Sequence, residues 1–281
     1  MPAWAPHLAT AIAFLALFAG PMRSLASQLW TDPDAGHGLL LIPLAGWLAW
    51  KRGVAPNAKA QPWLGLAMIA GAVLLRYVGG LAAELFTMRF SLFITLLGLV
   101  VFHKGVRQVL HWWLPVALLL LSIPLPVVVL GSLAMPLQLK ASQIGAALLE
   151  WRQVPVLLNG NVLNIPGQTL FVTEACSGLR SLSALIALGV LIGGLWLKYP
   201  ATRVLLLLLT LPVAILLNGV RVFLTGFLVF FVDPKLGEGF MHVTEGWVIF
   251  AIAFALIGAV AWFLLQGEGL VARWRERRAV A

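Results

Sequence analysis

The chain contains a single cysteine, Cys176, within the stretch TEACSGLRSL at 173–182. This thiol lies where a short polar, strand-like segment meets a long apolar run, so we expect it at the start of a helix. The positive end of the helix dipole favours a thiolate, and Arg180, four residues later on the same helical face, favours it further. A cysteine that only fills space is the alternative, and the local sequence leaves both interpretations open.

A second stretch, NGVRVFLTG at 218–226, places Arg221 in an otherwise apolar run. A charge inside a membrane costs about 2.5–3.5 kcal/mol on insertion scales, so this arginine should face a polar cavity. Asn218 and Thr225 lie three residues before it and four after it, on the same helical face. Snorkelling to the membrane surface is the alternative. The expected helix end is about 15 Å away at the helical rise, which favours a functional role.

A third stretch, GEGFMHVTEGW at 237–247, carries His242 just before the last apolar run. Histidine is the side chain best suited to take a proton from a thiol near neutral pH. Glu245, three residues later, is placed to orient the ring, and the flanking glycines allow close approach. A solvated loop histidine is the alternative interpretation.

The elements that must position these residues are membrane helices. Hydrophobic residues make up 61% of the 281 residues, charged residues only 10%, and the mean hydropathy is +0.98. A soluble domain needs far more polar surface, so the composition indicates a polytopic membrane protein. About eight apolar runs approach the roughly 20 residues that a spanning helix needs. They lie at 8–22, 39–50, 63–78, 86–102, 109–130, 179–197, 204–231 and 246–266.

The longest connection, between the fifth and sixth runs, predicts a small β-structure before the cysteine. Asn159-Gly160 is a hairpin signal between strands at 154–158 and 161–165, and Pro166-Gly167 precedes a third strand at 168–172. A helix at 133–150, with Gln138, Ser142 and Gln143 on one face, is expected near the membrane surface. The predicted fold class is an all-α polytopic membrane protein with an extracytoplasmic β-hairpin, in a single domain over residues 1–281.

The charges separate by side. One set of loops and the tail hold the whole net charge of +9, while the opposite loops carry equal numbers of acidic and basic residues. The positive-inside rule makes the basic side cytoplasmic, with both termini inside. A solvated cytoplasmic face explains the basic charge, so nucleic acid is not expected as a partner. Basic side chains on that face include Lys51, Arg52, Lys59, Lys104, Arg107, Lys198, Arg203, Arg273, Arg275, Arg277 and Arg278.

This topology brings Cys176, Arg221 and His242 to the same, outer side of the membrane on three consecutive helices. A thiol beside a base is the arrangement for nucleophilic catalysis, and an arginine is suited to stabilise the oxyanion of a tetrahedral intermediate. The three side chains together predict acyl transfer from a peptide bond, with no cofactor and no metal.

A fourth stretch, WTDPDAGHGLLLIP at 30–43, places Asp32, Asp34 and His37 at the outer start of the second run. Ordinary turn chemistry is one interpretation of these residues. A metal site is the other, but it has little support because no H-x-x-H-type pair accompanies them. A membrane transferase for lipid or polysaccharide that uses these residues is the leading alternative function. A small transporter with Arg221 as an intramembrane binding residue is a third interpretation.

The motifs around Cys176, Arg221 and His242 resemble those of the exosortases, membrane transpeptidase-like enzymes of Gram-negative bacteria. The stretches at 30–43 and 123–143, and NGNVLNIPGQTLFV before the cysteine, also look like family features, so the resemblance covers nearly the whole chain. By this resemblance, Cys176 matches the nucleophile, Arg221 the catalytic arginine and His242 the catalytic histidine. Substrate-binding or supporting candidates are Glu174, Ser177, Arg180, Asn218 and His37.

The resemblance further implies the substrates and the location. Substrates would be exported proteins whose C-terminal signal combines a Pro-Glu-Pro-type (PEP-CTERM) motif, one membrane helix and a basic tail. The enzyme would cleave near the motif and pass the protein to a surface acceptor, in systems that accompany exopolysaccharide production. The location would be the bacterial inner membrane, with the active site at the periplasmic face. A separate accessory protein is a further possible partner.

Overall fold

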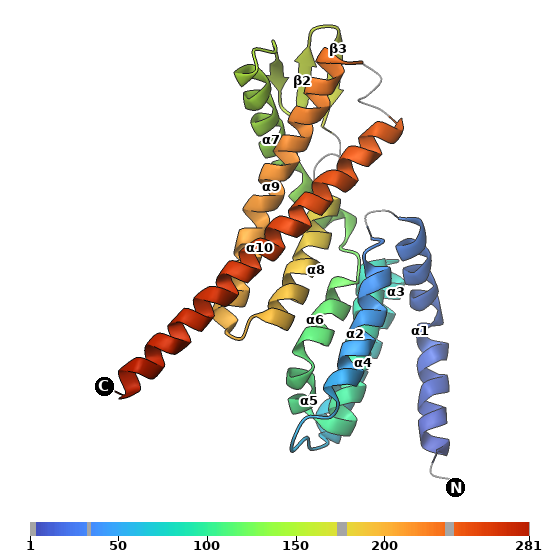
Figure 1. Cartoon of the computed structure of the whole chain (residues 1–281). Coiled ribbons are helices and arrows are strands. Elements are labelled where there is room, and N and C mark those ends of the chain that lie inside the picture. The colour runs from blue at the N-terminus through green and yellow to red at the C-terminus, as the bar shows by residue number, and fades with distance from the viewer. Residues whose placement is uncertain (1–3, 33–34, 173–178, 234–238, 281) are drawn as a thin grey trace. The chain divides into compact units, whose positions relative to one another are not determined.

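The protein is described by a computed structural model that covers residues 4–32, 35–172, 179–233 and 239–280. The chain divides into two compact units, Met1–Pro126 and Val127–Ala281 (Figure 1). The sequence predicts a single domain over residues 1–281. Whether the two units form one domain depends on how they assemble, so this stays a prediction.

The first unit is helical throughout its described residues. Its α1 continues well beyond the predicted range 8–22, because a helix satisfies its own backbone and does not have to end where the apolar residues end. The helices of this unit are α1 (Ala5–Thr31), α2 (Gly38–Arg52), α3 (Pro62–Leu81), α4 (Leu85–Lys104), α5 (Val106–His111) and α6 (Trp113–Leu121).

Helices α3 and α4 pack closely because glycines face each other between them. A Cβ atom on Gly65 would lie 2.5 Å from both the Cα and the backbone nitrogen of Phe102. A Cβ atom on Gly98 would lie 3.2 Å from the carbonyl oxygen of Gly65. Small residues that let two backbones approach are the usual basis of helix packing in membranes.

Two charged residues near the start of α4 shape this end of the first unit. The Glu84 carboxylate caps α4 by accepting hydrogen bonds from the backbone nitrogens of Phe86 (3.0 Å) and Thr87 (2.5 Å). Arg89 is buried and donates to the side-chain oxygen of Gln28 and to the carbonyl of Ser24 at 3.2 Å, which ties α4 to α1. The sequence patterns above did not single out this buried arginine inside a candidate membrane helix.

The predicted helix at 109–130 is wrong in its extent. The structure has two short helices, α5 and α6, separated at Trp112, and α6 ends at Leu121. Pro124 and Pro126 follow; each lacks a backbone N–H and disfavours helical backbone in the residue before it, so the apolar run 109–130 belongs to three helices. Its last residues open α7.

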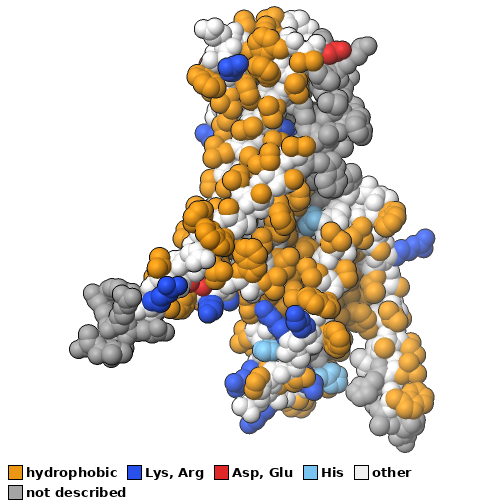
Figure 2. Space-filling model, in the orientation of Figure 1, with side chains coloured by type: hydrophobic (Ala, Val, Ile, Leu, Met, Phe, Trp, Pro, Cys, Tyr) orange, Lys and Arg blue, Asp and Glu red, His pale blue; other side chains and the backbone are white. Residues whose placement is uncertain are grey.

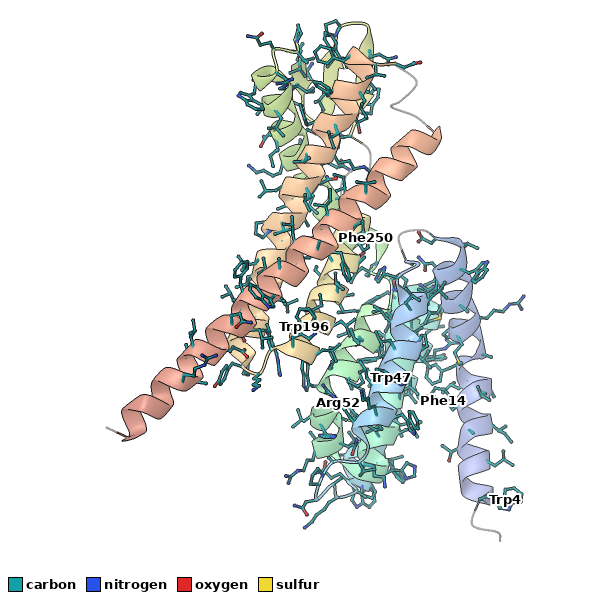
Figure 3. All side chains as sticks on the ribbon, viewed as in Figure 1. Trp4, Phe14, Trp47, Arg52, Trp196 and Phe250 are labelled. Atoms are coloured by element: carbon teal, nitrogen blue, oxygen red, sulfur yellow. The ribbon has the colours of Figure 1, made fainter. Side chains whose placement is uncertain are left out.

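Basic side chains gather at the end of the first unit where α2 and α4 finish (Figure 2). Arg52 lies at the end of α2 and donates to the carbonyl oxygen of His111 at 3.2 Å (Figure 3). The buried side chain of Gln108 bonds to the backbone of Gly53 and Ala55, at 3.1 and 2.8 Å. These contacts hold the α2–α3 loop against α5.

The second unit combines helices with one small sheet. Figure 1 shows α9 running the length of this unit, with α7 and the sheet beside its C-terminal half and α8 beside its N-terminal half. The elements are α7 (Val127–Trp151), β1 (Leu157–Asn159), β2 (Val162–Ile165), β3 (Gln168–Phe171), α8 (Leu179–Trp196), α9 (Pro200–Phe231) and α10 (Gly239–Val280).

The three strands form an antiparallel sheet in the order β1-β2-β3, as the turn signals predict. Gly160 and Gly167 have φ values of 63° and 81°, a region that favours glycine, and they close the two turns. The first strand is shorter than the predicted 154–158 and begins at Leu157. Pro155 lacks a backbone N–H, so the ladder cannot extend back to Val154.

Two apolar clusters hold the second unit together. One joins α7, the sheet and the C-terminal half of α9, and includes Leu149, Leu163, Val172 and Val222. The other joins α8, the N-terminal half of α9 and α10. The buried carboxylate of Glu268 in α10 accepts hydrogen bonds from the backbone nitrogens of Lys198 and Tyr199 at 3.0–3.2 Å, which fixes α10 to the α8–α9 turn.

The polar face predicted for the helix at 133–150 is wrong. In α7, Gln138 and Ser142 are buried, whereas Gln143 is exposed. The buried pair is satisfied inside the protein, because the Ser142 hydroxyl donates to the Gln138 carbonyl at 2.8 Å and Asn161 reaches the Gln138 side chain. Helix α7 packs along α9, and its position relative to the membrane surface stays a prediction.

Five helices in the described part of the chain are long and apolar enough to cross a membrane. They cover Leu8–Thr31, Pro62–Leu81, Leu85–Lys104, Pro200–Phe231 and Val248–Arg273, and a shorter apolar helix covers Leu182–Trp196. The predicted mostly helical membrane architecture is therefore confirmed, with five candidate spans, and the total of eight stays a prediction.

Candidate active site

The candidate site is built around the C-terminal half of α9. Asn218 is buried, Arg221 is half-buried with its Nε atom shielded from solvent, and the Thr225 hydroxyl donates to the Arg221 carbonyl at 3.1 Å. The spacing of three and four residues places the three side chains along one face of the helix, as predicted.

Close packing of α7 fixes the position of this part of α9. A Cβ atom on Gly219 would lie 2.4 Å from Cγ2 of Ile144, and one on Gly145 would lie 2.5 Å from Cγ1 of Val222. The two contacts flank Arg221 along α9. The arginine is therefore attached to a stretch of backbone that cannot shift without displacing α7.

The sheet brings the chain toward the same stretch of α9. Val172, the first residue after β3, is buried in the apolar cluster that also contains Val222, the neighbour of Arg221. The backbone nitrogen of Val172 donates to the carbonyl oxygen of Asn161 at 2.9 Å. Val172 is thus held both by packing and by the sheet.

Helices α8 and α9 run antiparallel to each other, and the glycines of α8 define their register. Gly189 faces Thr210 and Leu207, and Gly193 faces Leu206. From the Gly189–Thr210 contact, Leu179 is ten residues back along α8 and Arg221 is eleven residues forward along α9. Since both helices rise about 1.5 Å per residue, the first residue of α8 lies at the level of Arg221.

Several predicted site residues lie outside the described residues. These are Cys176, Glu174 and Ser177, in the segment 173–178 between Val172 and α8. Arg180 and His242 belong to helices α8 and α10, but the structure describes only the backbone at these two residues. Their roles stay predictions.

The predicted start of the last helix is wrong. The apolar run predicts a start at residue 246 with His242 in the preceding loop, whereas α10 begins at Gly239 and contains His242. Hydropathy marks where a helix becomes apolar, and the polar residues that precede this point can still be helical. His242 is therefore held by a helix backbone that continues from the membrane span.

His37 and Asp32 belong to the first unit. His37 immediately precedes α2, and Asp32 follows α1, where its carboxylate accepts a hydrogen bond from the Gln28 side chain at 3.1 Å. Asp34 is outside the described residues. Within the described parts of the chain, no three His, Cys, Asp or Glu side chains come together as a metal site would require.

Comparison with known families gives the decisive observation. The family model described as transmembrane exosortase (Exosortase_EpsH) matches residues 29–259, most of the chain. The chain belongs to the transmembrane exosortase family. No curated protein and no solved structure matches it. As an exosortase it is a multi-pass membrane protein, and the match spans Cys176, Arg221, His242 and the stretch around His37.

One polar pair in this exosortase was missed by the sequence analysis. Asn161 was considered only as the start of a strand, and Gln138 only as part of a polar face. The structure joins them, because Asn161 Nδ2 donates to Gln138 Oε1 at 3.4 Å. Gln138 is 5% exposed, and a buried amide needs such a partner. The only signal in the sequence was a polar residue in an apolar segment.

Proposed function

We propose that this exosortase is a membrane cysteine peptidase or transpeptidase, with Cys176 as nucleophile, His242 as general base and acid, and Arg221 as oxyanion stabiliser. The family is known for cysteine transpeptidases. This chain has one cysteine, which leaves one candidate for the nucleophile.

The register of α8 against α9 is the observation that carries the proposal. Leu179 lies at the level of Arg221, and Cys176 is three residues before Leu179. From the other side, Cys176 is the fourth residue after Val172, a reach of at most about 14 Å for an extended chain. Both described ends of the segment that carries the thiol therefore support a position near the guanidinium.

The packing of α10 supports the assignment of His242. Helices α8, α9 and α10 pack against one another through a shared apolar cluster, and Glu268 holds α10 to the α8–α9 turn. Arg221 and His242 thus belong to two of three mutually packed helices, and Cys176 comes three residues before the first residue of the third, α8. Asn218, buried one turn before Arg221, is proposed to support the arginine.

The proposed reaction is a two-step acyl transfer. The Cys176 sulfur attacks the scissile carbonyl carbon while His242 takes the thiol proton, and Arg221 stabilises the resulting oxyanion. The C–N bond breaks, His242 gives its proton to the leaving amine, and a thioester remains on Cys176. Water or an acceptor nucleophile then loses a proton to His242, attacks the thioester and releases the thiol.

The family membership supports the substrate class and the location. We propose exported proteins with PEP-CTERM-type C-terminal signals as substrates, in a bacterial inner membrane. Of the described helices, five are long enough to cross a membrane alone. We propose that α2, α8 and the pair α5–α6 form three further spans, which makes eight. An even number of spans puts both termini on one side, and the basic loops favour the cytoplasm for that side. We therefore propose that Cys176, Arg221 and His242 lie at the periplasmic face. Glu174, Ser177, Arg180 and His37 are proposed as supporting residues.

Co-expression with a protein that bears a PEP-CTERM tail tests the proposal. Cys176→Ala should abolish processing while the protein still accumulates in the membrane, and wild-type enzyme should form a covalent adduct on Cys176. Normal processing by Cys176→Ala would refute the proposal.

Alkylation of the thiol should inactivate a cysteine enzyme, whereas a transferase that uses His37 and Asp32 would stay active. Solute uptake into proteoliposomes would instead indicate a transporter.

A further inference from the structure

The side chain of Asn161 links the sheet to α7 at the point where the chain leaves β3. Its Nδ2 atom donates to the carbonyl oxygen of Val172 at 3.1 Å and to Oε1 of Gln138 at 3.4 Å. An asparagine amide has two N–H donors, and both are used here. Since Val172 also donates to the Asn161 carbonyl at 2.9 Å, both backbone polar groups of Val172 are bonded to Asn161.

Gln138 provides the fixed end of this link. It lies in α7, 5% exposed, six residues before Ile144, the residue that packs against Gly219 of α9. Removing the Asn161 amide would take a hydrogen-bond partner from the buried Gln138 side chain, and a buried polar group without its partner costs more than the hydrogen bond itself contributes. The link therefore continues from Val172 through Asn161 and α7 to the part of α9 that carries Arg221.

Val172 is the last described residue before the segment with the cysteine. Strand β3 ends at Phe171, and at Val172 one backbone hydrogen bond to the Asn161 carbonyl continues the pairing. Apolar packing buries Val172 but is not directional. The two hydrogen bonds to Asn161 are directional: they orient the backbone N–H and the C=O of Val172, because hydrogen bonds weaken steeply away from linear geometry.

We propose that Asn161, held by Gln138, is a positioning residue that sets how the Cys176 segment leaves the sheet relative to Arg221. The inference rests on the proposed function, since it assumes that Cys176 and Arg221 act together. A misplacement of about 1 Å in an active site can cost about 100-fold in rate. Loss of the link should therefore lower the rate of the chemical step more than the binding of substrate.

The test compares two asparagines of the same sheet. Asn161→Ala removes the link to α7, whereas Asn164→Ala is the matched control, because Asn164 bonds only within the sheet, to Leu157 and Thr169, in the contacts described. Processing of a purified PEP-CTERM protein in proteoliposomes gives kcat and KM. The pH dependence of maleimide labelling reports directly on Cys176, since the chain has no other thiol.

We expect Asn161→Ala to lower kcat by 10-fold or more at nearly unchanged KM, and to move the labelling profile of Cys176 to higher pH. Asn164→Ala should change neither. Gln138→Met should resemble Asn161→Ala, and the double variant should be no worse than the more impaired single one. If Asn161→Ala does not accumulate, Asn161→Asp, which keeps the shape but loses both donors, carries the same expectations.

The inference is overturned if Asn161→Ala and Asn161→Asp match Asn164→Ala in both kcat and labelling profile. It is also overturned if the effects of the Asn161 and Gln138 substitutions simply multiply. These outcomes differ from failure of the proposed function, in which Cys176→Ala would still process the substrate. If Cys176→Ala loses processing while Asn161→Ala processes the substrate normally, only the positioning role of Asn161 is rejected.

Discussion

Arg221 and Arg89 are both arginines in membrane helices, but their surroundings differ. Arg89 is buried and bonded to Gln28 and Ser24 of α1, so its charge stabilises the packing of the first unit. Arg221 lies half-buried beside the glycine contacts between α7 and α9, at the level where α8 begins. The contacts of Arg89 therefore indicate a structural role, whereas the chemical role of Arg221 stays a proposal.

Replacing Arg221 tests this chemical role. Arg221→Ala should lower processing of a PEP-CTERM protein by about 100- to 1,000-fold, the usual cost of losing an oxyanion donor. Arg221→Lys should recover only part of this loss, because lysine lacks the planar pair of donors. Arg203→Lys is a control on the same helix, where the side chain bonds the Leu197 carbonyl. Equal processing by the Arg221 and Arg203 variants would exclude the oxyanion role.

Glu84 gives a pH-dependent contribution to stability. Burial raises the pKa of its carboxyl, but hydrogen bonds from Thr87 and Phe86 and the charge of Arg89 outweigh this, so the pKa lies below its ordinary value. A lowered folded pKa means that the stabilisation is complete above the unfolded value, about 4.3. It is lost as pH falls through the lower folded value.

Thermal unfolding of the detergent-solubilised protein between pH 3 and pH 7 checks this expectation. Wild type should lose stability towards the acid end relative to Glu84→Gln, and the two curves should converge once the carboxyl is protonated. At pH 7, Glu84→Ala should be less stable by about 1 kcal/mol, the usual contribution of a helix cap. A difference between wild type and Glu84→Gln that does not change with pH would contradict the assignment.

At the scale of elements, glycines decide which helices pack closely. Gly65 and Gly98 join α3 to α4, Gly145 and Gly219 join α7 to α9, and Gly189 and Gly193 set the register of α8. Lipid tails are as apolar as leucine, so close packing, rather than burial of apolar surface from water, selects helix partners in a membrane. The candidate site depends on two of these glycine contacts.

Substitution of Gly65 tests the first of these contacts. Gly65→Ala places a Cβ 2.5 Å from the Phe102 backbone, which cannot move independently of α4, so we expect a loss of about 1–3 kcal/mol. Gly71→Ala is the matched control on the same helix, because its Cβ would meet nothing within 4 Å. Melting temperatures in detergent should separate the two variants, and equal values would contradict the tight contact.

At the scale of the whole molecule, charge and cysteine content make the membrane orientation measurable. The basic loops and tail are expected in the cytoplasm, and the single thiol on the periplasmic side. A membrane-impermeant maleimide added to intact spheroplasts should therefore label wild type and not Cys176→Ala. A fluorescent protein fused after Ala281 should fold and fluoresce, as it does only in the cytoplasm. Labelling of Cys176 only after lysis would reverse the orientation.

The sequence by itself determined the membrane class, the apolar helices, the Asn159-Gly160 hairpin and the family, because hydropathy, turn residues and motifs are local properties of the chain. It did not give the division of the run at 109–130 or the helical start before His242. Those ends depend on prolines and on backbone hydrogen bonds, which hydropathy does not record.

Only the tertiary structure decided that Leu179 lies level with Arg221, and that Asn161 reaches Gln138. Both relations join residues far apart in the chain. The first depends on which glycine faces which helix, and the second on how the sheet packs against α7. Several helices of similar hydropathy have equivalent apolar faces, so composition cannot select among their possible registers. Close contacts between backbones select one of them, because only one arrangement leaves no side chain in the way.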